Sequence, residues 1–219
     1  MLVYSSTEEN YLKAIYKFSL TQKKGTSTNA IAKALNTKAS SVTDMLKKLA
    51  TKNLIDYKKY YGVNLTLKGE QVALSIIRNH RLWEVFLVEK LHFKWNEVHE
   101  LAEELEHIKS DKLIANLDAF LNFPTFDPHG DPIPSKHGKI KKVELQNLTQ
   151  LNENEEGTFF HVKDSSDNFL NYLSKNNLKI GLKIKVKEIE PFDNSIKISY
   201  NNQQLIISKN VAKNLYIKN

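Results

Sequence analysis

The chain of 219 residues contains no cysteine. Disulfide bonds and thiolate metal ligands are therefore excluded, and any metal site has to use carboxylate, imidazole, amide or carbonyl groups. Such donors favour Mn(II), Fe(II) or similar ions over structural zinc. The composition, with 41% hydrophobic and 26% charged residues, is that of a globular protein with one large domain or two small ones.

Long apolar runs are also missing. No segment approaches the roughly 20 apolar residues of a membrane span, and the N-terminus lacks the basic and then apolar pattern of a secretory signal. These absences predict a cytoplasmic protein with no membrane partner.

Arginine is absent before Arg78, so the positive charge of the N-terminal part is carried by lysine alone. Residues 1–75 hold 12 Lys against 5 Asp plus Glu, whereas residues 76–219 hold 20 basic and 20 acidic groups. The whole net charge of +7 therefore arises before residue 76. A polyanion, most simply nucleic acid, is the expected partner of that part.

Apolar spacing and capping residues in the first 75 residues predict three helices and a hairpin. The expected elements are a helix over 7–20 capped by Ser5, Ser6 or Thr7, a short helix capped by Ser27 or Thr28, a third helix over 40–52, and strands over 54–59 and 63–66. This order indicates a winged helix-turn-helix.

The third helix and the hairpin carry the groups expected to meet DNA. Small hydroxyl residues allow close approach to the double helix, and lysines neutralise phosphates. Since the usual bidentate arginine is missing, readout is expected to depend on hydroxyl groups and DNA shape. The alternative for each lysine is ordinary solubility. The DNA-binding candidates are Ser27, Thr28, Ser40, Ser41, Thr43, Lys47, Lys48, Lys58, Lys59 and Tyr60.

Residues 96–110 are predicted to form one helix that begins at Asn96, with Ser110 capping the next helix. At about 100° per residue, His99, Glu103, Glu106 and His107 form a polar stripe beside an apolar one. A divalent cation would satisfy carboxylates and imidazoles gathered at the edge of a core. The alternative is a solvated charged face.

Two familiar metal motifs match this stretch only in part. His99 and Glu100 begin an H-E-x-x-H pattern, but Glu103 stands in place of the second His. Residues 104–107 read as the E-x-x-H of a di-iron bundle, but a second copy is missing from the sequence.

A long helix is predicted over residues 67–91. Within it, His80 and Glu84 lie one turn apart and share a face. A second helix, over residues 96–110, follows after a short loop, so antiparallel packing would let the two polar stripes converge. A pair of this kind also occurs in many helices as a weak ion pair.

Several segments together carry a resemblance to a known family. They are residues 9–16, the helix-turn-helix, residues 79–84, residues 98–111 and the Asp-Pro-His-Gly-Asp-Pro-Ile-Pro run of residues 127–134. In this order they resemble the diphtheria-toxin-repressor family of metal-dependent transcriptional repressors. The resemblance covers essentially the whole chain and implies a homodimer with two metal sites per subunit and metal-activated binding to double-stranded DNA.

Carried over by position, the resemblance places a primary metal site at Asn10, Glu103, Glu106 and His107. Iron-responsive members usually have Cys and Met at the positions of Glu103 and Asn10, and manganese-responsive members have Glu and Asp. Glu103 therefore favours Mn(II) over Fe(II). Asn10 offers only an amide oxygen, and Lys13 stands where compact manganese regulators have a further Glu ligand.

The resemblance also implies an ancillary site at His80, Glu84 and His99. In longer family members the C-terminal barrel adds a Glu and a Gln to that site. The corresponding turn aligns Ser165 and Asn168 most directly, whereas Asp164 and Asp167 are chemically better suited. The alternative is a solvated turn that caps the following helix.

The expected fold class is mainly α with a small β part. Four segments are predicted: a winged helix-turn-helix DNA-binding domain over 1–75, a helical metal-binding and dimerisation domain over 76–122, a linker over 123–139, and an SH3-like (FeoA-like) β-barrel over 140–219. The last is indicated by alternating runs such as residues 142–145, 157–162, 183–186 and 196–198 around a helix at 167–175.

The sequence thus predicts a metal-dependent repressor of metal-uptake genes, with no enzyme activity and no small organic substrate. One alternative is a metal-independent winged-helix regulator that senses another ligand. A metallohydrolase or oxidase would need an open coordination position and a general base in a cleft, for which the sequence gives no support beyond the ligand types.

Overall fold

The computed structural model describes residues 4–21, 25–58 and 62–219, and the chain divides into two compact units. The first comprises Met1–His80, Glu103–Ile114 and Pro134–Ile140, and the second comprises Arg81–Ala102, Ala115–Ile133 and Lys141–Asn219. None of the helices in the described ranges has the length and apolar character that crossing a membrane requires.

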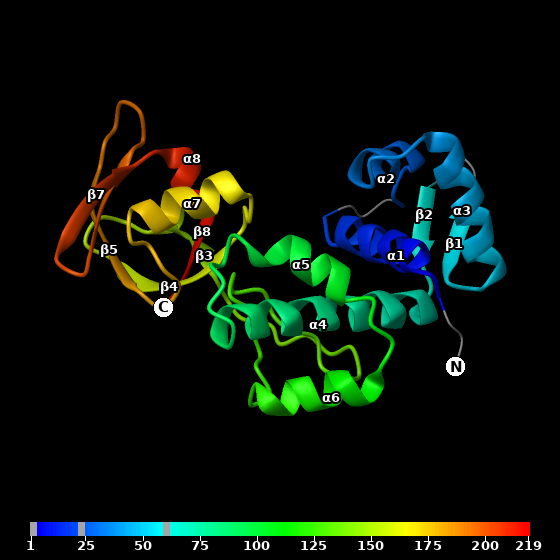
Figure 1. Cartoon of the computed structure of the whole chain (residues 1–219). Helices are drawn as coiled ribbons and strands as arrows, with labels where there is room; N and C mark the ends of the chain where they lie inside the picture. Colours follow the sequence, from blue (N-terminus) through cyan, green and yellow to red (C-terminus); the bar gives the residue numbers. More distant parts are fainter. Residues whose placement is uncertain (1–3, 22–24, 59–61) are drawn as a thin grey trace. The chain divides into compact units, whose positions relative to one another are not determined.

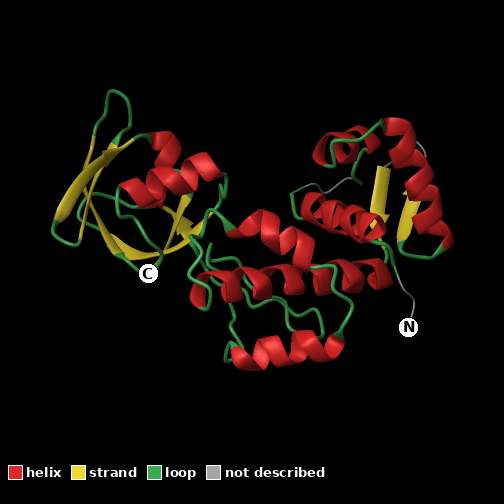
Figure 2. Cartoon of the chain, in the orientation of Figure 1, coloured by secondary structure: helices red, strands yellow, loops and turns green. Residues whose placement is uncertain are grey.

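The first unit contains a winged helix-turn-helix. Its elements are α1 (Ser6–Ser19), α2 (Thr28–Ala34), α3 (Ala39–Thr51), β1 (Ile55–Lys58), β2 (Gly62–Leu65) and the first part of α4 (Leu67–Glu89). The two strands are antiparallel, with Ile55 opposite Leu65, and lie beside α1 and α3 (Figure 2). Leu12, Ile31 and Leu46 are fully buried in its core.

Local sequence explains where these helices begin. Ser5 and Glu8 form a capping box at the start of α1, and the Ser27 hydroxyl accepts a hydrogen bond from the Ala30 amide at the start of α2. Of the alternatives left by the sequence, Ser5 and Ser27 are therefore the caps. The predicted wing residues Lys59 and Tyr60 lie outside the described residues.

The second unit contains the remainder of α4, the first residues of α5 (Val98–Leu105), most of α6 (Asp111–Phe120) and a six-stranded antiparallel sheet. The strand order is β3-β8-β4-β5-β6-β7, from β3 (Gln146–Asn147), β4 (Glu156–Val162), β5 (Lys183–Ile189), β6 (Ile196–Tyr200), β7 (Gln203–Ile207) and β8 (Leu215–Lys218).

Two helices lie beside this sheet, α7 (Asp167–Lys175) and α8 (Lys209–Ala212), and a short 3-10 turn covers Leu148–Gln150 (Figure 1). The apolar faces of the strands and of α7 bury Phe159, Leu170 and Leu173 in one core. The predicted fold class is confirmed, and α7 has the predicted bounds. The expected strand at residues 142–145 is wrong: residues 141–145 are irregular, and the strand begins at Gln146.

Candidate metal centres and DNA-binding surface

Glu106 lies at the centre of a buried polar cluster in the first unit. Its carboxylate is almost completely buried, and each of its two oxygens has a partner. The Lys13 ammonium donates to Oε1 at 2.5 Å, and the His80 Nδ1 nitrogen lies 2.7 Å from Oε2. Burying an acid between two nitrogen groups meets the requirement that a buried charge be paired.

Glu103 joins this cluster from the last turn of α5. The same Lys13 ammonium donates to Glu103 Oε2 at 2.7 Å, and His80 Nδ1 lies 4.0 Å from the other oxygen. Burial opposes ionisation of Glu103, but the hydrogen bond and charge of Lys13 outweigh it and lower the pKa of Glu103.

His107 is held on the edge of the cluster by a residue that the sequence did not single out. Its Nδ1 lies 2.6 Å from the Glu9 carboxylate, and its Nε2 faces Glu106 Oε1 at 3.6 Å. A carboxylate that fixes one imidazole nitrogen while the other faces an acidic group is the usual arrangement around a metal-ligating histidine. The sequence signal that could have identified Glu9 is its position next to the predicted ligand Asn10 on α1.

Asn10 lies on α1, next to Glu9, and the oxygen end of its side-chain amide is buried. Its Oδ1 atom is buried and accepts no hydrogen bond from the residues that the structure describes. Because such an oxygen is costly to bury without a partner, it fits a role as a ligand. The donors of this first cluster, all oxygen or imidazole nitrogen, suit a divalent ion such as Mn(II).

The predicted helix over residues 96–110 is wrong at both ends. The helix covers only Val98–Leu105, and Asn96 lies in the preceding turn. Glu106 and His107 therefore leave the helical path, and Glu106 turns into the buried cluster around Lys13 and His80. The prediction that Ser110 caps the next helix is confirmed, because its hydroxyl accepts the Leu113 amide.

A second buried cluster lies within the second unit and consists of Glu84, Asp127 and His129. One ligand atom from each lies within 4.8 Å of the others, and all three side chains are buried. His129 Nε2 donates to the Trp95 carbonyl oxygen at 2.8 Å, while Nδ1 lies 3.8 Å from Glu84 Oε2. As with His107, one ring nitrogen is fixed by hydrogen bonding and the other faces a carboxylate.

A tight turn positions Asp127 and His129. The Asp127 Oδ1 atom accepts hydrogen bonds from the backbone amides of His129 and Asp131 at 2.8 and 2.9 Å. Gly130 has a φ of +86°, and a Cβ at this residue would lie 2.1 Å from the Phe160 carbonyl oxygen. Only glycine fits both requirements, so the turn and the acid it presents depend on Gly130.

The ionisable groups of the second cluster shift one another's pKa. Burial and the neighbouring carboxylates of Asp131 and Glu84 raise the pKa of Asp127 to about 7, against the opposing effect of Arg81. Burial opposes protonation of His129, but Glu84 and Asp127 raise its pKa to about 9. A divalent cation bound among these acids would relieve the repulsion between their carboxylates.

The structure distributes the three predicted ancillary residues between the two units. His80 pairs with Glu106 in the first unit. Glu84 lies in the second unit, where His99 Nδ1, on an exposed side chain, is 3.5 Å from Glu84 Oε1. The sequence missed Asp127 and His129 as ligand candidates. The signal available in the sequence was their place in the Asp-Pro-His-Gly-Asp-Pro-Ile-Pro run of residues 127–134.

The predicted contribution of the β domain is not part of this cluster. Asp164 accepts a hydrogen bond from the Ser166 amide at 2.9 Å, while Asp167 and Asn168 are exposed at the start of α7. Neither aspartate belongs to the group of Glu84, Asp127 and His129 among the described residues.

The predicted DNA-binding side chains lie along α2, α3 and β1. Ser40, Ser41 and Lys58 are exposed. Thr28 and Thr43 are half-buried, and Thr43 hydrogen-bonds the Ala39 carbonyl oxygen. The exposed Ser40 and Ser41 hydroxyls therefore lie on α3, and the exposed Lys58 ammonium lies on β1.

Two lysines of α3 also have partners within the protein. Lys47 lies 3.3 Å from Asp44, and Lys48 lies 3.2 Å from Glu8, which also pairs with Lys52 at 2.6 Å. Burial raises the pKa of Glu8, but Lys52, the Ser5 amide and Lys48 lower it to about 2 overall. Glu8 thus fixes α3 on α1 by its charge.

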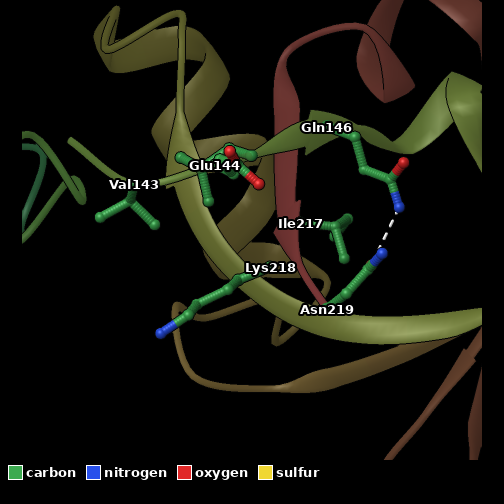
Figure 3. Close-up of a pocket in the computed structure, with 7 residues that line it drawn as sticks. Val143, Glu144, Gln146, Ile217, Lys218 and Asn219 are labelled. Carbon is green, nitrogen blue, oxygen red and sulfur yellow. Dashed lines mark hydrogen bonds between the residues drawn. The ribbon is translucent and has the colours of Figure 1, made fainter.

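A shallow groove of about 400 Å³ lies at the β3–β8 end of the sheet. Figure 3 shows Gln146 and Asn219 meeting across it, through a hydrogen bond of 2.9 Å. None of the predicted metal-binding or DNA-binding residues lines this groove, so the candidate sites are the two buried clusters and the α3 surface.

Three matches to known domains cover nearly the whole chain. Residues 3–63 match the iron dependent repressor N-terminal DNA binding domain, and residues 66–135 match the iron dependent repressor metal binding and dimerisation domain. Residues 146–219 match the FeoA domain. The chain belongs to the iron-dependent repressor family. The suspected resemblance to metal-dependent DNA-binding repressors is confirmed.

Individual relatives agree with this assignment. The HTH-type regulator MJ0568 of Methanocaldococcus jannaschii is 38% identical over 117 residues, which are 53% of this chain and 94% of that protein. The HTH-type transcriptional regulator MntR of Oceanobacillus iheyensis is 33% identical over 68% of this chain and 95% of its own length. A probable metal transport system membrane protein of Chlamydia trachomatis is 46% identical over 76 residues, which are 35% of this chain and 17% of that protein.

Among solved structures, a manganese-dependent transcriptional repressor in complex with manganese is similar over 96% of this chain and 98% of its own, with a TM-score of 0.83 and 31% sequence identity. The chain therefore shares its fold with a manganese-dependent repressor whose structure is a complex with manganese.

Proposed function

We propose that the chain represses genes for metal-ion uptake, with Mn(II) favoured over Fe(II) as its co-repressor. The preference for Mn(II) is supported by the donors, since Glu103, Glu106 and Asn10 offer only oxygen and the chain has no thiolate. The link to uptake is supported by the likeness of a segment of the chain to a probable metal transport protein.

The observation that carries the metal part of the proposal is the way two histidines are held. His107 and His129 each have one ring nitrogen fixed by a hydrogen bond, to Glu9 and to the Trp95 carbonyl oxygen, and the other directed at a buried carboxylate. We infer that one ion is held by Asn10, Glu103, Glu106 and His107, and a second by Glu84, Asp127 and His129.

The first set of ligands suggests how metal would control DNA binding. Asn10 lies on α1 of the DNA-binding domain, whereas Glu103, Glu106 and His107 lie at the end of α5 and just after it. An ion bound by these residues would attract donor groups of α1 and donor groups at the end of α5 to the same positive charge. If it binds the DNA-competent arrangement more tightly, it shifts the population towards that arrangement.

We propose that the chain acts as a homodimer on double-stranded DNA. Phe120, Phe123 and Leu91 expose large apolar side chains in the helical part of the second unit, with 60%, 66% and 51% of their surface accessible. Apolar surface of this kind is typical of a subunit interface. Ser40, Ser41 and Lys58 are proposed to face the DNA.

The experiment is a gel-shift titration on operator DNA selected from a random pool, with Mn(II), Fe(II), Mg(II) or a chelator. Mn(II) is expected to raise DNA affinity by about 5–150-fold, the usual range of allosteric coupling. Glu103→Ala should remove that gain, while Glu100→Ala, an exposed position on the same helix, should retain it. Identical binding in every lane would exclude metal control and favour a metal-independent regulator.

A further inference from the structure

Lys13 is the buried ammonium group between the two acids of the first cluster. It projects from α1, only 6% of its surface is accessible, and its Nζ atom lies 2.7 Å from Glu103 Oε2 and 2.5 Å from Glu106 Oε1. Both acids come from a segment about 90 residues away in sequence. One lysine therefore joins α1 to residues 103–106 within the first unit.

This ammonium supplies much of the positive charge that the acids need. Glu106 is fully buried, and its second oxygen is taken by His80 at 2.7 Å. Two acids this close would repel each other without a cation between them, so the cluster is balanced by the protein itself.

The position of the Lys13 Nζ atom leaves no room for a divalent ion bound to Glu103 and Glu106 at the same time. A divalent ion bound to carboxylates lies about 2.0–2.2 Å from their oxygens, whereas Nζ already lies within hydrogen-bond distance of one oxygen from each acid. An ion that bridges Glu103 and Glu106 would have to occupy nearly the same volume. The lysine side chain would then have to withdraw its ammonium from both carboxylates.

We propose that Lys13 is a tethered cation that holds α1 to residues 103–106 in the metal-free chain and competes with the divalent ion for Glu103 and Glu106. The competition rests on the proposed function, because it takes these acids as metal ligands. Its consequences are a partly ordered metal-free state and a lowered metal affinity at this site. Lysine suits the role because its flexible stem lets a compact charge move.

The first test needs no metal and uses the full chain in the presence of a chelator. Lys13→Met should lower the Tm by about 5–10 °C, because breaking a buried pair leaves uncompensated charge. Lys33→Met, at an exposed position of α2, is the matched control and should change it little. Adding Glu106→Gln to Lys13→Met should recover part of the loss, as expected for partners in one ion pair.

If Lys13→Met does not fold, Lys13→Gln replaces it, since glutamine keeps a hydrogen-bond donor without the charge. A folded Lys13→Met or Lys13→Gln chain with an unchanged Tm, or an additive double variant, would overturn the structural part of the proposal.

The second test is a Mn(II) titration of the full chain, followed by the electron paramagnetic resonance signal of the free aqueous ion. Lys13→Met should bind Mn(II) at this site at least about tenfold more tightly than the wild type, equivalent to about 1.4 kcal/mol. Lys13→Arg, which keeps the charge, should stay near the wild-type affinity. The gain should vanish when Glu103→Ala is added to Lys13→Met.

Two negative results have different meanings. If Glu103→Ala weakens Mn(II) binding by the wild type but Lys13→Met does not strengthen it, the competition is wrong and the proposed metal site stands. If Glu103→Ala changes Mn(II) binding in neither background, these acids do not bind the ion, and both the competition and the primary-site part of the proposed function fail.

Discussion

The two buried clusters achieve charge balance differently. Around Glu106, a lysine ammonium lies directly between two carboxylates. Around Glu84 and Asp127, the positive charge comes from His129 and from Arg81, whose Nε lies 3.5 Å from Asp127 Oδ2. A lysine side chain swings away with its charge intact, whereas a histidine loses its proton and becomes a ligand itself. The difference teaches that two clusters with similar oxygen and imidazole groups can balance their buried acids by different cations, a lysine ammonium in one and an imidazolium with a guanidinium in the other.

The largest expected effect follows from removing the charge at the centre of the first cluster. Glu106→Gln leaves Lys13 and His80 without their shared buried carboxylate. We expect the free energy of unfolding of the metal-free chain to fall by about 3–4 kcal/mol, measured by urea denaturation. Glu104→Gln, an exposed neighbour, is the control. A loss below that of Glu104→Gln would show that the cluster does not stabilise the first unit.

The second prediction concerns the second cluster and its histidine. His129→Ala should weaken binding of one Mn(II) by about 100-fold, since removing even an outer partner of a metal site costs 10–100-fold. The titration would be compared with His137→Ala, an exposed histidine in a turn. Because no lysine of the described residues is paired with Glu84 or Asp127 in the ion pairs above, adding Lys13→Met should leave the affinity of this second ion unchanged. Equal loss in both histidine variants would argue against the site.

The architecture was predictable because its signals are local. Ser5 and Ser27 cap helices, and apolar spacing defines α1, α3 and α7 within a few residues. In the β domain, β7 and β8 were missed. Residues 142–145 alternate like a strand without being one, because pairing with a neighbouring strand, rather than alternation, decides whether a strand forms.

The candidate sites were less predictable, because their contacts are not local. The stripe on residues 99–107 indicated acids and histidines that meet. The helix ends at Leu105, however, and Glu106 contacts Lys13, which lies 93 residues away in sequence. The sequence marked Lys13 only as a residue that replaces a Glu ligand of the compact manganese regulators, and it did not indicate that Lys13 pairs with Glu103 and Glu106. Asp127 and His129 were visible only as part of a family motif, since nothing in their spacing reveals Glu84 as a neighbour.

The third prediction separates the backbone requirement of the second cluster from its charges. Gly130→Ala should lower the free energy of unfolding by about 2 kcal/mol or more, because a positive φ costs about 1–2 kcal/mol and the Phe160 carbonyl oxygen blocks the Cβ. Gly181→Ala shares the positive φ but meets nothing within 4 Å. It should therefore lose only the smaller, conformational part. Equal losses would mean that the turn relaxes without disturbing Asp127.

The smallest effect is expected at the other ion pair of α1. Glu8 is buried and pairs with Lys48 of α3 and with Lys52 just after it. Here a buried acid of α1 meets two lysines, whereas the other pair has a buried lysine of α1 between two acids. Both lysines are partly open to solvent, which screens the interaction. Glu8→Gln should therefore lower the free energy of unfolding by only about 1–2 kcal/mol, with Glu70→Gln, exposed in α4, as control. A loss as large as that of Glu106→Gln would show that burial of the acid, rather than enclosure of its cationic partner, sets the strength of these pairs.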